Sequence, residues 1–315
     1  MSKLSSSFAT LSLVASWVLL VSSWRPAAAE SAANAVKPLI LRLTLVAASE
    51  RFDRDDALKP IQEALIKQGT AAIGPLRKLL QSSDLRIGDA AATVLENFDD
   101  PKVKEAVISY ALRALVDPSS TKKEPLGPGF QHLEKLGKAA LPAMVKAYTE
   151  MAKKPLARQN PRYLLYLAEI AAELPDRAGR PLLSQALQSP WYEVVSKAAQ
   201  MIGAPGDQAA YELLIPMLNP RNVHCSGARG RFDYRLGVVG GLAVIGNRDA
   251  VEPLYHLLMS LDLPPSDQPA SMREEIHPSL QKVIRGAIAK LTGEDIGKDS
   301  YRIEQWIDAY RKQRR

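Results

Sequence analysis

One helical face recurs five times along this chain of 315 residues, and no other feature limits its possible folds as strongly. Counting back from the end of each copy, the residues three, four, seven, eight and eleven positions earlier are apolar, aromatic or small. These offsets lie on one side of an α-helix. The copies end at Phe98, Leu174, Ile202, Ile245 and Leu291. The repetition therefore predicts several helices that each bury the same face.

A second kind of helix alternates with the first. It starts with Pro or Gly and continues as Leu-x-x-Leu-Leu or a variant, as after Pro75, Pro181 and Pro253. Proline is tolerated there because the N–H groups of a first turn have no partner inside the helix. The last apolar positions of these helices recur about every 31 to 40 residues, a period typical of stacked helical pairs. We therefore predict an all-α fold, an α-solenoid of about six to seven helical pairs.

Composition agrees with a helical stack. Hydrophobic residues make up 46% of the chain but aromatic residues only 6%, whereas sheet sandwiches favour β-branched and aromatic residues. The single cysteine, Cys225, excludes an internal disulfide. We therefore expect the fold to be held by its core alone.

The first residues have the layout of a secretory signal peptide. Lys3 precedes an uncharged apolar segment, 8–21, and Ala27-Ala28-Ala29 precedes Glu30 as an A-x-A cleavage site. An uncleaved membrane anchor is the alternative, but the apolar segment is shorter than the roughly 20 residues that span a bilayer. A second possible cut lies before Val36. No cysteine is near enough for lipoprotein attachment.

These observations divide the chain into a signal peptide (1–29), a linker or N-terminal extension (30–50) and the solenoid (51–315). Loss of Lys3 and Arg25 with the signal peptide would lower the formal charge from +7 to +5. This mild excess is not typical of specific nucleic-acid binding. We expect an exported protein, periplasmic or extracellular, that is monomeric and has no stable membrane insertion after cleavage.

The segment 234–254 resembles the HEAT-repeat family, in its bacterial form often called PBS-lyase-like. It reads Tyr-Arg-Leu-Gly-Val-Val-Gly-Gly-Leu-Ala-Val-Ile-Gly-Asn-Arg-Asp-Ala-Val-Glu-Pro-Leu. It is similar to the family pattern of Arg, paired small residues, Leu, Ile-Gly-Asp and Ala-Val-x-x-Leu. The resemblance covers about 55–315 and is weakest near 128–137. The ending, with Trp306, looks like that of some exported bacterial members, and predicts a capping helix over 299–313 that buries Ile303 and Trp306.

The resemblance implies protein binding, with no shared catalytic residues. The sequence itself contains no pair of histidines spaced for zinc, no phosphate-binding loop and no nucleophile elbow. We therefore predict no enzymatic activity, no cofactor and no metal. His224-Cys225 is more typical of an ordinary loop pair than of a nucleophile. Glu169, near Tyr163 and Tyr166, is the faint candidate for a catalytic carboxylate.

Two charged segments have ordinary interpretations. The mixed run 51–56 is typical of a solvated helix cap. The basic tail 311–315 is typical of a frayed helix end favoured by the helix dipole, although it could also contact an anionic surface.

One copy of the repeat predicts where a partner binds. Along the side that faces away from the core, the copy ending at Ile245 is apolar, with Val239, Gly240 and Ala243. Apolar strips and arginines are common at interfaces. The arginines of the preceding loop are Arg221, Arg229 and Arg231. The alternative is that the loop or a neighbouring helix covers the strip, which would explain the glycines of this copy by close packing.

The sequence leaves three alternative functions for this chain. The first is an exported, non-catalytic scaffold that binds a protein partner through its concave surface. The second is an enzyme or lyase-like HEAT protein. The third is a weak binder of anionic polymers, which would lose affinity steeply as salt rises.

Overall fold

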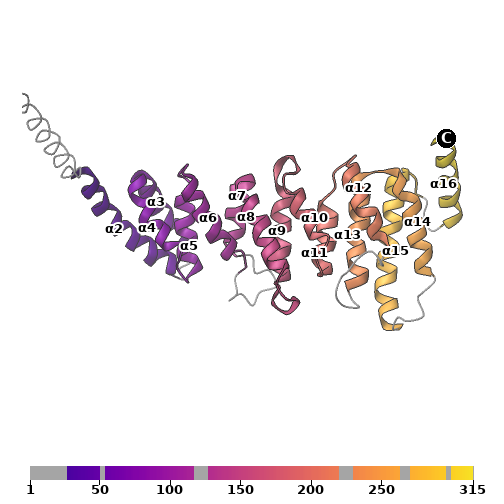
Figure 1. Cartoon of the computed structure of the whole chain (residues 1–315), viewed down its shortest axis with the longest axis horizontal. Helices are drawn as coiled ribbons and strands as arrows, with labels where there is room; N and C mark the ends of the chain where they lie inside the picture. The colour runs from indigo at the N-terminus through magenta and orange to yellow at the C-terminus, as the bar shows by residue number, and fades with distance from the viewer. Residues whose placement is uncertain are drawn as a thin grey trace, which may run out of the picture. The chain divides into compact units, whose positions relative to one another are not determined.

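The computed structural model describes residues 27–49, 54–116, 127–219, 230–262, 270–295 and 299–314. Within these ranges all regular structure is helical, as Figure 1 shows. The prediction of an all-α fold is confirmed. The chain divides into two units, Met1–Ala114 and Leu115–Arg315, where the sequence predicted one solenoid over 51–315. The boundary falls just before the degenerate copy of the repeat.

The helices of the first unit pack around α5. Helix α5 contacts every other helix of the unit, and its alanines, together with Val94 and Leu95, are buried. Asp84 and Asp100 cap α5 and α6, each accepting a hydrogen bond from a first-turn N–H group. The helices are α2 (Ala27–Ala48), α3 (Arg54–Lys67), α4 (Thr70–Leu79), α5 (Leu85–Leu95) and α6 (Pro101–Arg113).

Residues 30–48, predicted as part of a linker or N-terminal extension, lie in α2, which packs against α3, α4 and α5. Val36, Leu43 and Ala47 are its buried residues, spaced seven and four apart. That spacing is a helical face, so the sequence did contain the signal, but the segment lies before the first copy of the repeat. The first unit therefore begins before residue 50.

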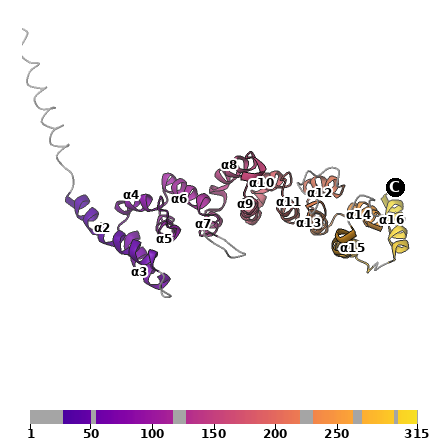
Figure 2. The same cartoon turned by 90° about the horizontal axis from the view of Figure 1, so that it is seen from below.

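The second unit consists of two layers of helices (Figures 1 and 2). Helices α7, α9, α11, α13 and α15 contact one another in succession, while α8 contacts α10, and η4 contacts α14, on the other side. The helices are α7 (Gly129–Leu136), α8 (Leu141–Ala152), α9 (Pro161–Glu173), α10 (Arg180–Ala186), α11 (Tyr192–Met201), α12 (Gln208–Leu214), α13 (Gly230–Ile245), α14 (Val251–Asp262), α15 (Ala270–Thr292) and α16 (Ser300–Arg314). Short 3-10 helices join them: η1 (Gly137–Ala139), η2 (Leu156–Arg158), η3 (Pro175–Arg177), η4 (Ile215–Leu218) and η6 (Arg248–Ala250). The predicted alternation of two kinds of helix is confirmed.

Helices α11 and α13 approach each other closely through two glycines. A Cβ atom on Gly237 would lie 1.9 Å from the carbonyl oxygen of Ser196, and one on Gly241 would lie 2.1 Å from that of Ala199. Both oxygens belong to the backbone of α11, which cannot move aside as a flexible side chain could. The spacing of four residues puts both glycines on one face of α13. These glycines are therefore required by contact between two helices of the same layer.

A buried aspartate joins two neighbouring pairs of helices. Asp207 is the N-cap of α12 and accepts a hydrogen bond from the N–H of Ala210 at 3.1 Å. Its carboxylate also binds two guanidinium groups, that of Arg177 at 2.8 Å and that of Arg180 at 2.6 Å. Arg177 lies in η3, just before α10, and Arg180 is the first residue of α10. The side chain of Asp207 is only 3% exposed.

The C-terminal helix α16 partly agrees with the predicted cap. Ile303 is buried, as expected, and α16 contacts α14. Trp306, however, is only half-buried, and Ile307 takes its place in the core. Residues four apart share a face of a helix, so Ile303 and Ile307 form the buried stripe. Trp306 is left at its edge.

Candidate functional site

The strip predicted on α13 as part of a partner-binding groove is partly buried in the structure. Val239 is 0% exposed, and Gly240 and Ala243 are half-buried. A Cβ atom on Gly240 would lie 3.5 Å from Cγ of Gln200. Helices α11 and α15 both pack on α13, while Val244 of this helix is 40% exposed. The three residues are therefore not an exposed apolar strip.

No described contact places the three arginines predicted to border the groove beside this strip. Arg221 and Arg229 lie outside the described residues. Arg231 lies in the first turn of α13, and only its backbone is described. The pair His224-Cys225 is also outside the described residues.

The faint candidate for a catalytic carboxylate, Glu169, forms an ion pair with a lysine of the neighbouring helix. Glu169 lies 3.1 Å from the ammonium group of Lys197. Tyr166 makes an edge-to-face contact with Phe130, and burial raises the pKa of Tyr163 to about 12. These contacts are those of packed neighbouring helices. In the described ranges, three or more metal-binding side chains do not gather anywhere.

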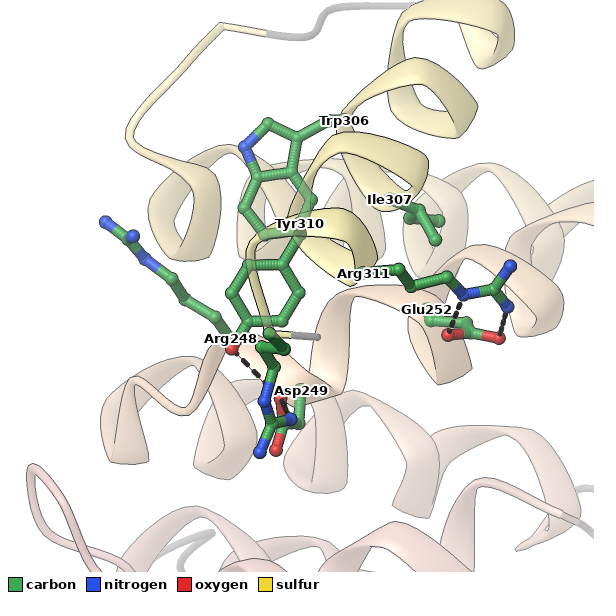
Figure 3. Close-up of a pocket in the computed structure, with 8 residues that line it drawn as sticks. Arg248, Asp249, Glu252, Trp306, Ile307, Tyr310 and Arg311 are labelled. Atoms are coloured by element: carbon green, nitrogen blue, oxygen red, sulfur yellow. Dashed lines mark hydrogen bonds and ion pairs between the residues drawn. The ribbon is translucent and has the colours of Figure 1, made fainter.

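A pocket of about 410 Å³ lies between α16 and the start of α14 (Figure 3). Helix α16 contributes five of the eight lining side chains, η6 two and α14 one. The lining residues are Arg248, Asp249, Glu252, Trp306, Ile307, Tyr310, Arg311 and Arg314. The pocket forms where α16 packs on residues that precede it in the sequence by about 59 to 65 positions. Its volume is within the usual size range of ligand sites.

An aromatic pair forms one wall of this pocket. The rings of Trp306 and Tyr310, one helical turn apart, are stacked with centroids 5.0 Å apart and an angle of 16° between their planes (Figure 3). The hydroxyl of Tyr310 donates a hydrogen bond to Oδ1 of Asp249 at 3.0 Å. Burial and this hydrogen bond both raise the pKa of Tyr310, so it stays protonated at neutral pH. The hydrogen bond holds the Tyr310 ring in position, and with it the aromatic wall of the pocket.

The two carboxylates of the pocket are held by arginines of α16. Arg311 donates two hydrogen bonds to Glu252, and Arg314 binds Asp249 (Figure 3). The interpretation of the tail 311–315 as a frayed end is therefore wrong for these two residues, since they fasten α16 to the start of α14. Ion pairs at such exposed positions each contribute only about 0.2–1 kcal/mol.

Arg248 differs from the other arginines of the pocket. Its side chain is exposed, and across the described part of the chain it makes neither an ion pair nor a side-chain hydrogen bond. Because both carboxylates already have arginine partners, the pocket has one uncommitted positive charge beside an aromatic wall. Such a site can bind an anionic group that carries an apolar part.

The sequence contains two signals for this pocket that periodicity alone did not reveal. Arg248 and Asp249 lie inside the segment that resembles the HEAT family, and Trp306 lies in the predicted cap. What brings them together is the position of α16, which depends on contacts distant in the sequence.

None of the helices within the described ranges is long and apolar enough to cross a membrane.

No model of a known protein family matches the chain, and no curated protein matches its sequence. Two solved structures are similar in part. The complex of CpcE and CpcF of phycocyanin lyase from Nostoc sp. PCC7120 is 17% identical, with a TM-score of 0.31, over 86% of this chain and 92% of that chain. An engineered protein is 18% identical, with a TM-score of 0.24, over 80% of this chain and 97% of that chain.

Proposed function

We propose that this chain is an exported, non-catalytic HEAT-type repeat protein that binds a protein partner. The observation that carries the proposal is the pocket at α16, where stacked aromatic rings adjoin an uncommitted arginine. Tryptophan, tyrosine and arginine are the residues most enriched among those that dominate binding energy at protein interfaces. The concave surface predicted from the sequence is replaced in this proposal by the pocket, because Val239 of the strip predicted on α13 is buried.

Photo-cross-linking tests the proposal. A photoreactive amino acid replaces Arg302, which is exposed and lies one turn before Trp306 on the same face of α16. The matched control is the same amino acid at Arg158, another exposed arginine that does not line the pocket. In cells of the natural host we expect one protein to cross-link from Arg302 and not from Arg158. Equal labelling from both positions, or none from either, contradicts binding at this pocket.

A binding assay with the purified protein at rising salt concentrations separates the alternative of an anionic polymer. A polymer held by charge alone should be lost between roughly 50 and 200 mM salt. Binding through the aromatic wall should persist, because apolar contacts are not screened by salt.

Export has its own test. Helix α2 begins at Ala27, so cleavage after Ala29 would remove three residues and leave the face with Val36 and Leu43 in place. We expect mass spectrometry of the protein from its host to find Glu30 as the first residue, or Val36 if the second cut is used. A form that keeps Met1 would contradict cleavage.

A further inference from the structure

The charges around the pocket favour one class of ligand. Three arginines and two carboxylates line it. Both carboxylates accept hydrogen bonds from arginines of α16, and Asp249 accepts one more from Tyr310. An incoming cation would have to displace these partners. An anion needs to displace nothing, because Arg248 is available.

The shape of the lining selects among anions. The guanidinium of arginine is a planar fork that matches a carboxylate with two parallel hydrogen bonds. The neighbouring wall consists of the Trp306 and Tyr310 rings, and Ile307 is 7% exposed beside them. A ligand that uses both features has a carboxylate and an apolar group close together.

The size of the pocket favours the end of a chain. A C-terminal residue presents its carboxylate and its own side chain on one Cα atom. An internal acidic residue instead brings two flanking segments of backbone, and both would have to pass the side chains that line this pocket of about 410 Å³. Capture of a terminal carboxylate is a recurring mode of peptide recognition.

We propose that this pocket binds the C-terminal carboxylate of a partner whose last residue is apolar, with Arg248 as the anion-binding residue and Trp306 and Tyr310 as the apolar wall. This inference rests on the proposed function and specifies which part of the partner is bound. It makes Arg248 the residue that determines specificity for a free carboxylate.

The indole N–H of Trp306 provides the readout. The chain has four tryptophans, so a nitrogen-15 spectrum contains few indole signals, and Trp306→Phe identifies the one from the pocket. The full chain is titrated with acetyl-Gly-Gly-Leu bearing a free carboxylate and with its C-terminal amide. We expect only the free carboxylate to shift the Trp306 signal.

Substitutions then test the role of Arg248. Loss of a charge-assisted hydrogen-bonded pair should weaken binding about tenfold or more in Arg248→Ala. Arg248→Lys should recover part of the affinity, because it restores the charge but not the fork. Arg158→Ala removes an exposed arginine that does not line the pocket, and should bind as the unchanged protein does.

The outcomes that overturn the inference are distinct. Equal binding of the amide would show that the carboxylate is not recognised. Stronger binding of acetyl-Gly-Glu-Leu-Gly-amide would show that a side-chain carboxylate is the ligand, and competition by inorganic phosphate at equal concentration would show a general anion site. If no peptide binds while cross-linking from Arg302 succeeds, the proposed function stands and the C-terminal carboxylate is wrong. Peptide binding without cross-linking would support the ligand class and contradict the protein partner.

Discussion

We expect Gly237→Ala to lower the melting temperature clearly, while Gly240→Ala, three residues later in the same helix, leaves it unchanged or raises it. The two substitutions add the same methyl group to α13. They differ in what that group meets. On Gly237 it would lie 1.9 Å from a backbone oxygen of α11, whereas on Gly240 its nearest neighbour is the side chain of Gln200 at 3.5 Å.

The expected sizes follow from packing and helix propensity. Two helices pressed apart lose contacts along their whole interface, and overpacking of this kind costs about 1–3 kcal/mol, occasionally more. Alanine favours a helix over glycine by up to about 1 kcal/mol, which acts in favour of both variants. The clash exceeds this gain in Gly237→Ala, and nothing opposes it in Gly240→Ala. Gly241→Ala should resemble Gly237→Ala, because its methyl group would meet the backbone of Ala199.

Thermal unfolding followed by circular dichroism measures the difference. For a unit of this size, each kcal/mol corresponds to roughly 2–4 °C. Hydrogen exchange should place the loosened amides of Gly237→Ala in α11 and α13, since each helical pair of a repeat protein contacts only its neighbours. If both variants melt alike, the close approach of the two helices is incorrect.

The repeat could be predicted because its signal is local. Apolar or small residues at offsets of three, four, seven and eight mark the buried face of each helix, and the ends of four copies, Leu174, Ile202, Ile245 and Leu291, are buried. Val283, eight residues before Leu291, is an exception and is exposed. Helix starts are equally local, since Asn160 caps α9 through its side chain just before a first-turn proline. Fold class and the order of helices follow from such patterns.

The glycines of α13 show where local patterns end. Their cost to the helix indicated that something approaches closely, and both a neighbouring helix and a partner were consistent with that. The contact of Gly237 is made by Ser196, in a different helix. Periodicity within α13 shows which face is small, but it does not show which element occupies it.

The pocket was missed for the same reason. Arg314 and Asp249 are 65 positions apart, and Tyr310 and Asp249 are 61 apart. An apolar residue in a terminal helix is ordinarily assigned to the core, as Trp306 was. Its half-buried position depends on the direction in which α16 crosses α14, and no offset within α16 specifies that direction.

Asp207→Ala is the second substitution from which we expect a large loss of stability. The buried carboxylate caps α12 and binds Arg177 and Arg180, so alanine removes three partners at once. Breaking a buried ion pair often costs 3–5 kcal/mol, but these arginines are partly exposed and can be rehydrated. We therefore expect a loss of about 2–3 kcal/mol, including about 1 kcal/mol for the cap.

Asp207→Asn is the matched control. The amide oxygen can still accept the hydrogen bond from the N–H of Ala210, while the charge that binds the two arginines is gone. We expect a smaller loss than in Asp207→Ala, by about the value of a cap. Equal losses in the two variants would show that the ion pairs carry the whole effect.

The pH dependence of stability identifies the charge itself. Burial alone would raise the pKa of Asp207, but hydrogen bonds from Arg180 and Ala210 and the charges of both arginines outweigh it and hold the pKa below its usual value. A carboxyl with a lowered pKa in the folded state stabilises the fold at pH values above its unfolded pKa of about 3.9. That stabilisation is lost as the pH falls through the lower, folded pKa. The difference in unfolding free energy between the unchanged protein and Asp207→Asn should thus be constant near neutral pH and shrink below about pH 4. A difference that persists undiminished in acid would show that Asp207 stabilises the joint between α10 and α12 without its charge.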